Sequence, residues 1–124
     1  MTSHPTYRSL LAVPASSPRF MEKAAQGPSD ALFLDLEDAV IPALKPKARQ
    51  EAITALNRLD WGRRGVAVRV NGFGTAWGCR DIIELVEACP RLDYILLPKC
   101  ESAADVHAVQ VMIRSAEAAA PRER

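Results

Sequence analysis

Short apolar runs alternate with amphipathic stretches four times along the chain. The apolar runs have too few polar positions to leave one face in water, which is typical of the buried strands of a parallel sheet. We expect these strands at residues 9–13, 31–36, 64–70 and 93–97. After each run, apolar residues recur at helical spacing, which predicts an amphipathic helix. We expect these helices at residues 18–26, 45–59, 82–89 and 102–118.

Capping residues mark the ends of two of the expected helices. Ser16 and Ser17 are candidate N-caps for the first helix, and Pro18 suits its first turn, where a missing N–H costs nothing. Gly27 suits the left-handed position that follows a helix, and the next residue is a proline, which cannot continue it. Ser102 and Asp105 resemble a capping box for the fourth helix, with Asp in place of the usual Glu.

Four strand-then-helix units predict an α/β fold with a parallel sheet and right-handed crossovers. Two architectures fit this order: an open doubly wound sheet, and part of a TIM (β/α)8 barrel, which needs eight units and roughly 250 residues. Four units in 124 residues correspond to half of such a barrel. We expect a leader at 1–8, a partial barrel domain at 9–118 and a frayed tail at 119–124.

The composition is that of an ordinary globular domain, with 48% hydrophobic and 25% charged residues. The net charge of +1 argues against binding to nucleic acid or to anionic lipid. No apolar stretch approaches the roughly 20 residues that cross a bilayer, and the N-terminus lacks a signal-peptide core, so we expect a cytoplasmic protein. The three cysteines, Cys79, Cys89 and Cys100, are expected to be buried or half-buried thiols.

Three carboxylates, Asp35, Glu37 and Asp38, follow an apolar strand, and reactive groups in parallel α/β sheets gather beyond such strand ends. Charges this close repel each other unless cations or donors compensate, which favours a functional site over helix caps or solvated loop charges. Arg69 lies in a valine-rich strand, on the face that alternation shares with Asn71, and must find anions. Glu37 or Asp38, a bound carboxylate or a developing enolate are candidates, and a purely structural ion pair is the alternative.

Three further cations are candidates for binding substrate. Arg19 and Lys23 lie near the start of the first helix, where free N–H groups and cations suit a phosphate. The alternative is a capped helix with two solvated cations. Lys99 follows the fourth strand, where a lysine forms a Schiff base, binds an anion or is simply solvated.

Five motifs stand in order along the chain. They are Arg8–Pro14, Ser17–Ala24, Leu34–Val40, Val68–Gly72 and Leu97–Lys99. Together they resemble the HpcH/HpaI aldolase and citrate lyase β-subunit family, which includes malyl-CoA lyases. The resemblance runs from about Tyr7 to about Ala118. It implies an oligomeric TIM barrel that cleaves or forms carbon–carbon bonds in 3-hydroxyacyl thioesters, usually of CoA, with Mg²⁺.

The resemblance also implies roles for individual residues. Arg69 matches the active-site arginine that binds the substrate's oxygen atoms. Glu37 and Asp38 match the acidic pair beside the metal site, which holds water and Arg69 in position. Arg19 and Lys23 fall in the segment that contacts the CoA phosphates. The chain departs from the family at Ala15, where glycine is more usual.

The same resemblance implies that the two carboxylate ligands of Mg²⁺ come from later strands than those present here. We therefore expect no metal ligand within the chain and negligible lyase activity from residues 1–124 alone. The function expected of an intact enzyme is retro-Claisen cleavage of a malyl-, citramalyl- or citryl-CoA type thioester. Two alternatives remain: a 2-oxo acid aldolase of the same superfamily that uses no CoA, and a non-catalytic half-barrel that associates with itself.

Overall fold

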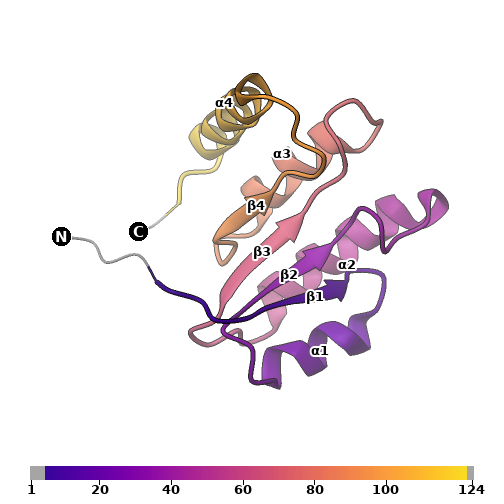
Figure 1. The fold of residues 1–124 in the computed structure, drawn as a ribbon, viewed down its shortest axis with the longest axis vertical. Coiled ribbons are helices and arrows are strands. Elements are labelled where there is room, and N and C mark those ends of the chain that lie inside the picture. Colours follow the sequence, from indigo (N-terminus) through magenta and orange to yellow (C-terminus); the bar gives the residue numbers. More distant parts are fainter. Residues whose placement is uncertain (1–4, 123–124) are drawn as a thin grey trace.

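The four apolar runs form one parallel sheet in a computed structural model that describes residues 5–122 (Figure 1). The strands are β1 (Leu10–Pro14), β2 (Ala31–Asp35), β3 (Gly65–Arg69) and β4 (Tyr94–Leu96). They pair in chain order, β1-β2-β3-β4, and all three pairings are parallel. The strand positions expected from the hydrophobic pattern are confirmed, since each expected bound lies within one residue of the observed one.

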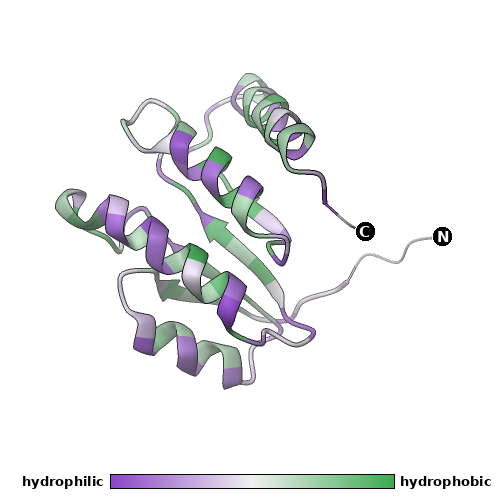
Figure 2. Cartoon of the chain, turned by 180° about the vertical axis from the view of Figure 1, so that it is seen from behind, coloured by the Kyte–Doolittle hydropathy of each residue, from purple (hydrophilic) through white to green (hydrophobic). Residues whose placement is uncertain are grey.

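A helix follows each strand, as the spacing of apolar residues predicts. The helices are α1 (Pro18–Gln26), α2 (Lys45–Arg58), α3 (Gly78–Ala88) and α4 (Ala103–Ala119), and a short 3-10 helix, η1 (Pro42–Leu44), precedes α2. Parallel strands that pair in chain order through right-handed crossovers place their helices on the same side of the sheet. Seen from behind, the helices lie in front of the strands (Figure 2).

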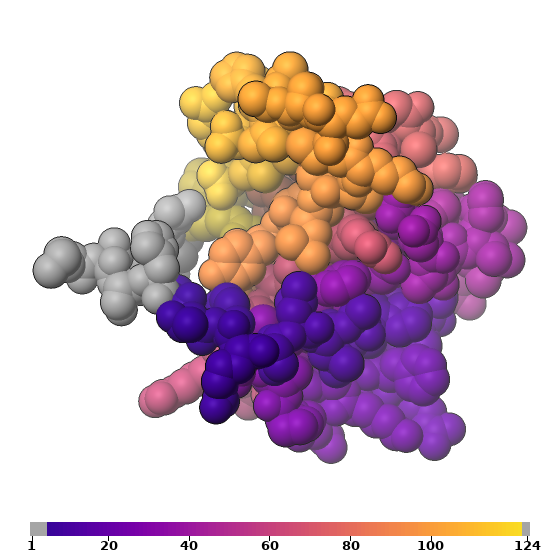
Figure 3. Space-filling view, in the orientation of Figure 1, coloured from indigo at the N-terminus to yellow at the C-terminus, as the bar shows by residue number. Residues whose placement is uncertain are grey.

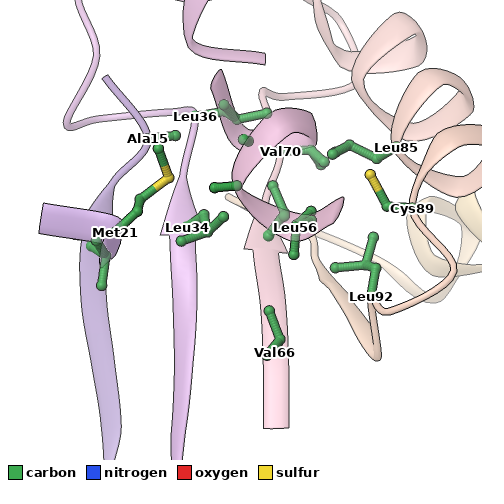
Figure 4. Packing of buried hydrophobic residues seen from close by; sticks show 14 of the residues in the cluster. Ala15, Met21, Leu34, Leu36, Leu56, Val66, Val70, Leu85, Cys89 and Leu92 are labelled. Carbon is green, nitrogen blue, oxygen red and sulfur yellow. The ribbon is translucent and has the colours of Figure 1, made fainter. Parts of the chain in front are cut away.

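The core lies between this helical layer and the sheet (Figure 4). Alternate strand residues point into it, and these side chains are fully buried: Leu32, Leu34, Val66 and Val68. Met21 of α1, Leu56 of α2 and Leu85 of α3 pack against them from the helices. Each such side chain contributes roughly 1.5–3 kcal/mol when it is removed from water. This packing holds the strand ends in a fixed relation to one another.

The opposite face of the sheet carries no helix. Phe33, Ala67 and Arg69 project to this face, and at its margins Leu10 of β1 is 55% exposed and Tyr94 of β4 is 44% exposed. Figure 3 shows the β1 segment in indigo and the β4 segment in orange at the surface. The expectation that the strands are buried on both faces is therefore wrong for the two outer strands, because no helix of the described residues covers this face.

Two helix ends differ from the expected capping. Ser17 does cap α1, because its Oγ accepts a hydrogen bond from the Phe20 amide at 3.3 Å. Gly27 is extended (φ −80°, ψ 178°) rather than left-handed. The reason is the proline that follows, which pushes the preceding residue into the extended region. At α4, Asp105 accepts from the amide of Glu101 at 3.0 Å, and the Ser102 side chain makes no cap.

The cysteines also differ from expectation. Cys89 is buried, but Cys79 and Cys100 are exposed, because they lie in the first turn of α3 and in the loop after β4. Burial raises the pKa of the Cys89 thiol to about 11, so this thiol is neutral at physiological pH.

Residues 1–4 of the expected leader and 123–124 of the expected tail lie outside the described residues. Within the tail, Arg122 donates hydrogen bonds to the carbonyls of Leu92 at 2.9 Å and Cys89 at 2.7 Å. Among residues 5–122, no helix has the length and apolar character to cross a bilayer.

Candidate functional site

The strongest polar contact at the carboxyl ends of the strands joins β2 to β3. Asp35 and Arg69 are register partners, the last residues of these two strands. Arg69 Nε donates to Asp35 Oδ1 at 3.0 Å, and Nη2 donates to Oδ2 at 2.6 Å. This paired geometry is the strong form of an arginine–carboxylate contact, and it fixes the plane of the guanidinium.

Asp35 is saturated with donors. Besides Arg69, its carboxylate accepts from the backbone amides of Glu37 at 2.8 Å and Ala39 at 3.2 Å. Burial of Asp35 by itself raises its pKa, but the hydrogen bonds from Arg69 and from the two amides outweigh burial, and the net pKa is lowered. The carboxylate therefore stays ionised and serves as a fixed anchor for the guanidinium.

Glu37 lies between the two cations of the site. Its Oε2 accepts from Lys99 Nζ at 2.8 Å, and its Oε1 lies 3.7 Å from Arg69 Nε. The Asp38 side chain is 69% exposed and lies 3.6 Å from Lys99 Nζ. The hydrogen bond that Lys99 donates to Glu37, together with the nearby Asp38, raises the pKa of Lys99. Lys99 itself has a positive φ of 50°, uncommon for a residue other than glycine, at the turn after β4.

Arg69 lies with its guanidinium on the helix-free side of the sheet, next to Phe33. Its guanidinium carbon lies 5.2 Å from the centre of the Phe33 ring, and the side chain is 30% exposed. Nε and Nη2 bind Asp35, and within residues 5–122 no hydrogen bond engages Nη1. A cation that is oriented by one carboxylate and still has a free donor is suited to bind an oxyanion of a substrate.

A hollow of about 260 Å³ adjoins Lys99. The loops that follow β3 and β4 line it: Gly72, Phe73, Gly74, Leu97, Pro98, Lys99, Cys100 and Asp105. The hollow thus lies beside the loop that carries Lys99.

A buried polar chain lies beneath these groups. Lys45 Nζ donates to Asn71 Oδ1 at 2.6 Å, and Asn71 Nδ2 donates to Asp81 Oδ2 at 2.8 Å. Asp81 Oδ1 in turn accepts from Arg49 Nε at 2.7 Å, and Arg49 Nη1 donates to Glu84 at 2.6 Å. Asn71 therefore reaches toward α2 and α3, and the expectation that it shares a face with Arg69 is wrong. The strand ends at Arg69, so the alternation of faces no longer applies at Asn71, two residues later.

Arg19 and Lys23 lie on exposed positions of α1, one helical turn apart. Neither forms a hydrogen bond or an ion pair with the residues that the structure describes. Lys23 also lines a largely apolar hollow of about 450 Å³ between β1 and α1, together with Leu11 and Phe20. Both cations are thus open to solvent and to an anionic ligand.

The fold brings together four of the six expected site residues: Glu37, Asp38, Arg69 and Lys99. The main partner of Arg69 is Asp35, which the sequence analysis did not pair with it, while the expected Glu37 forms a longer ion pair at 3.7 Å. Parallel register was the signal that sequence reasoning missed, since Asp35 and Arg69 each end a strand.

Sequence reasoning also missed the buried pair Lys45 and Arg49. Their signal was spacing, because Lys45 and Arg49 lie on the helical stripe that continues through Ala52 and Leu56. Both charged residues face the interior of the protein rather than solvent.

The described residues do not offer a cage for a divalent cation. Asp35 is occupied by Arg69 and two amides, and Glu37 is occupied by Lys99. No group of three or more His, Cys, Asp or Glu side chains between residues 5 and 122 is arranged to hold a metal ion. Carboxylates neutralised by neighbouring cations are poor ligands for Mg²⁺, which prefers free oxygen atoms.

Comparison with known proteins identifies relatives of the chain. L-malyl-CoA/β-methylmalyl-CoA lyase from Rhodobacter capsulatus is 44% identical over 112 residues, which make up 90% of this chain and 35% of that protein. (3S)-malyl-CoA thioesterase from Cereibacter sphaeroides is 43% identical over 111 residues, 90% of this chain and 38% of that protein. The chain thus spans about a third of the length of these curated relatives.

A solved structure has a similar fold over the aligned part. The citrate lyase β subunit from M. tuberculosis, complexed with oxaloacetate and magnesium, aligns with 92% of this chain and 44% of its own, with a TM-score of 0.64 and 37% identity. The four parallel β/α units therefore match a portion of a TIM barrel. The sequence profile of the HpcH/HpaI aldolase/citrate lyase family matches residues 8–123. The chain belongs to the HpcH/HpaI aldolase/citrate lyase family.

Proposed function

We propose that this chain forms the first four β/α units of a carbon–carbon lyase that acts on a 3-hydroxyacyl-CoA thioester of the malyl-CoA type. The observation that carries the proposal is the anchored Arg69, held by Asp35 with Nη1 free at the carboxyl ends of the strands. The names of the relatives support the substrate class, since two of them act on malyl-CoA or its derivatives.

The proposed reaction is a retro-Claisen cleavage. The hydroxyl group loses its proton, the O–H electron pair forms the carbonyl of a 2-oxo acid, and the adjacent C–C bond breaks. The electrons of that bond pass to the thioester, which becomes an enolate and is then protonated to the shorter acyl-CoA. Arg69 faces this chemistry as a fixed cation and stabilises negative charge on a substrate oxygen, an effect worth several kcal/mol in comparable sites.

Lys99, Arg19 and Lys23 have supporting roles in this proposal. Lys99 is fixed by Glu37 and adds a second positive charge at the strand ends. Arg19 and Lys23 are the exposed cations of α1, and they bind the phosphates of CoA. A solved relative holds magnesium. Because Asp35 and Glu37 are occupied, we propose that magnesium ligands in an active enzyme come from residues other than 5–122.

A chimaera tests the proposal. Residues 8–123 replace the aligned segment of the Rhodobacter capsulatus lyase, and cleavage of malyl-CoA with Mg²⁺ is measured as glyoxylate and acetyl-CoA. We expect activity in the chimaera and a loss of about 10²–10³-fold in kcat on Arg69→Ala, because a preorganised donor to a developing charge is removed. Arg58→Ala is the control, since Arg58 is an exposed cation that, among residues 5–122, pairs only with Glu22.

Three outcomes of this assay separate the candidates. A folded chimaera that forms neither glyoxylate nor acetyl-CoA contradicts the lyase. Release of free CoA with malate instead indicates a thioesterase, the reaction that one relative's name describes. Arg19→Ala with Lys23→Ala should raise the KM for malyl-CoA. An unchanged KM, with cleavage of a CoA-free 2-oxo acid aldol, favours the aldolase alternative.

A specific observation favours self-association as a second property. Leu10 and Tyr94 are large apolar side chains, half exposed at opposite margins of the helix-free face. Both outer strands also present unpaired backbone groups within the described residues, and such edges promote pairing with another chain. We propose that two copies of the chain associate through their helix-free faces, so that each face covers the other.

A further inference from the structure

The Lys45 ammonium is buried, and its surroundings are unusual for a lysine. Only 7% of the residue is exposed, at the first position of α2. Its Nζ donates to three acceptors: the carbonyl of Leu36 at 3.0 Å, the carbonyl of Glu37 at 2.8 Å and Asn71 Oδ1 at 2.6 Å. An ammonium has three donors, so every one of them is used.

None of these acceptors is a carboxylate. Through the Asn71 amide, Lys45 is linked to the carboxylate of Asp81, because Asn71 accepts from Lys45 and donates to Asp81. The Trp77 ring, 5.5 Å from Nζ, covers another side. A buried charge without a direct counter-ion carries a desolvation cost, so the arrangement calls for a role beyond packing.

The three acceptors lie on segments that carry the candidate site. Leu36 and Glu37 follow β2, and Asn71 follows β3, two residues after Arg69. The Glu37 backbone is held from both sides, because its amide donates to Asp35 and its carbonyl accepts from Lys45. With the backbone held in this way, the Glu37 carboxylate is directed to Arg69 and Lys99.

We propose that Lys45 is a positioning residue: its ammonium fixes the Glu37 backbone, so that the Glu37 carboxylate orients Arg69 and Lys99. An effect of Lys45 on catalysis depends on the proposed function. The positioning of Glu37 by Lys45 does not, and it can be measured in the free chain. Asn71, which accepts from Lys45, donates to Asp81 of α3, and Asp81 also accepts from Arg49 of α2.

The ionisation of Lys99 reports on this positioning. Glu37 and Asp38 are the charged groups that raise the Lys99 pKa, and the hydrogen bond that Lys99 donates to Glu37 is the largest cause. If Lys45 holds Glu37 in place, Lys45→Met releases Glu37 and the Lys99 pKa falls toward the ordinary lysine value. If Lys45 acts only as a nearby positive charge, its removal raises the Lys99 pKa instead. The two hypotheses therefore predict changes of opposite sign in the Lys99 pKa.

The experiment is an NMR titration of the Lys99 side-chain nitrogen in the 124-residue protein and in Lys45→Met. Lys47→Met is the matched control, an exposed lysine two residues along the same helix. We expect a lower Lys99 pKa in Lys45→Met and no change in the control. A raised or unchanged Lys99 pKa in folded Lys45→Met overturns the proposal, even if its thermal stability is reduced.

A second variant covers the case in which Lys45→Met does not fold. Lys45→Arg keeps the charge and the buried stem, but a planar guanidinium cannot direct three donors to the same convergent acceptors. We expect it to fold and to lower the Lys99 pKa, and an unchanged value in that variant overturns the positioning role.

The active chimaera separates this inference from the proposed function. There, Lys45→Met should lower kcat by about tenfold to a hundredfold, because a small misplacement of catalytic groups has effects of that size. The control Lys47→Met should leave kcat unchanged, and an unchanged kcat in Lys45→Met contradicts the catalytic part of the inference. Failure of the parent chimaera contradicts the lyase, while the Lys99 titration in the free chain still decides the positioning.

Discussion

Asp35 has the most partners of the carboxylates at the strand ends. It is buried, ends β2, and accepts hydrogen bonds from two backbone amides and from Nε and Nη2 of Arg69. Asp38, three residues later, is mostly exposed and meets one lysine at 3.6 Å. The two aspartates, three positions apart, therefore contribute differently to the free energy of unfolding, because burial strengthens an interaction that solvent otherwise screens.

Replacement of Asp35 tests this difference. Asp35→Asn removes the charge that holds Arg69, so we expect the free energy of unfolding to fall by about 1–3 kcal/mol at neutral pH. The matched control Asp38→Asn should change it by less than about 0.5 kcal/mol. Urea unfolding of the three proteins measures both effects, and equal effects would contradict the central place of Asp35.

The same pair makes stability depend on pH. The pKa of Asp35 is lowered in the folded protein, so its ionised form stabilises the fold above the unfolded pKa of about 3.9. That contribution is lost as the pH falls through the folded pKa. The difference between wild type and Asp35→Asn should therefore be full at pH 7 and shrink on acidification. A difference that stays constant down to pH 2 would show that Asp35 acts through packing alone.

Among the elements, α3 depends on a close backbone approach at its first residue. A Cβ at Gly78 would overlap the carbonyl oxygen of Gly72 and would lie 2.9 Å from that of Asn71. Both neighbours are backbone atoms of the loop after β3, so they cannot swing aside as a flexible side chain does. Glycine at this position lets the start of α3 pack against the loop that carries Asn71.

Gly78→Ala is therefore expected to destabilise the protein by about 1–3 kcal/mol, the usual cost of overpacking. Gly74→Ala is the matched control in the same loop, because a Cβ there would meet nothing within 4 Å. We expect that variant to be neutral or slightly stabilised, since alanine restricts the unfolded chain. Denaturant midpoints at constant m-value measure both, and a neutral Gly78→Ala would refute the close approach.

At the scale of the whole molecule, the helix-free face dominates. Helices cover one face of the sheet, while Leu10, Phe33 and Tyr94 remain partly or largely exposed on the other. A complete barrel buries this face among its own strands. A four-stranded sheet leaves it open to solvent, which favours association with a second apolar surface.

Light scattering across a concentration series tests the association. We expect a species of about twice the 13.6 kDa monomer mass. The double variant Leu10→Ser with Tyr94→Ser should shift it to monomer, because it removes apolar area from the face. Val111→Ser, at an exposed position on α4, is the control and should leave the mass unchanged. A folded monomer at every concentration would count against self-association.

The order of apolar runs and helical stripes determined the fold class, the strand positions and the alternation of strand and helix. These features are local, since each depends on burial of one face of one element. Sequence also indicated Glu37, Asp38, Arg69 and Lys99 as residues at strand ends. Tertiary structure alone decided which of them touch, because Arg69 lies 34 positions from Asp35 and meets it only through the register of two strands. The burial of Lys45 was likewise decided by packing, since its three acceptors come from two separate strand ends.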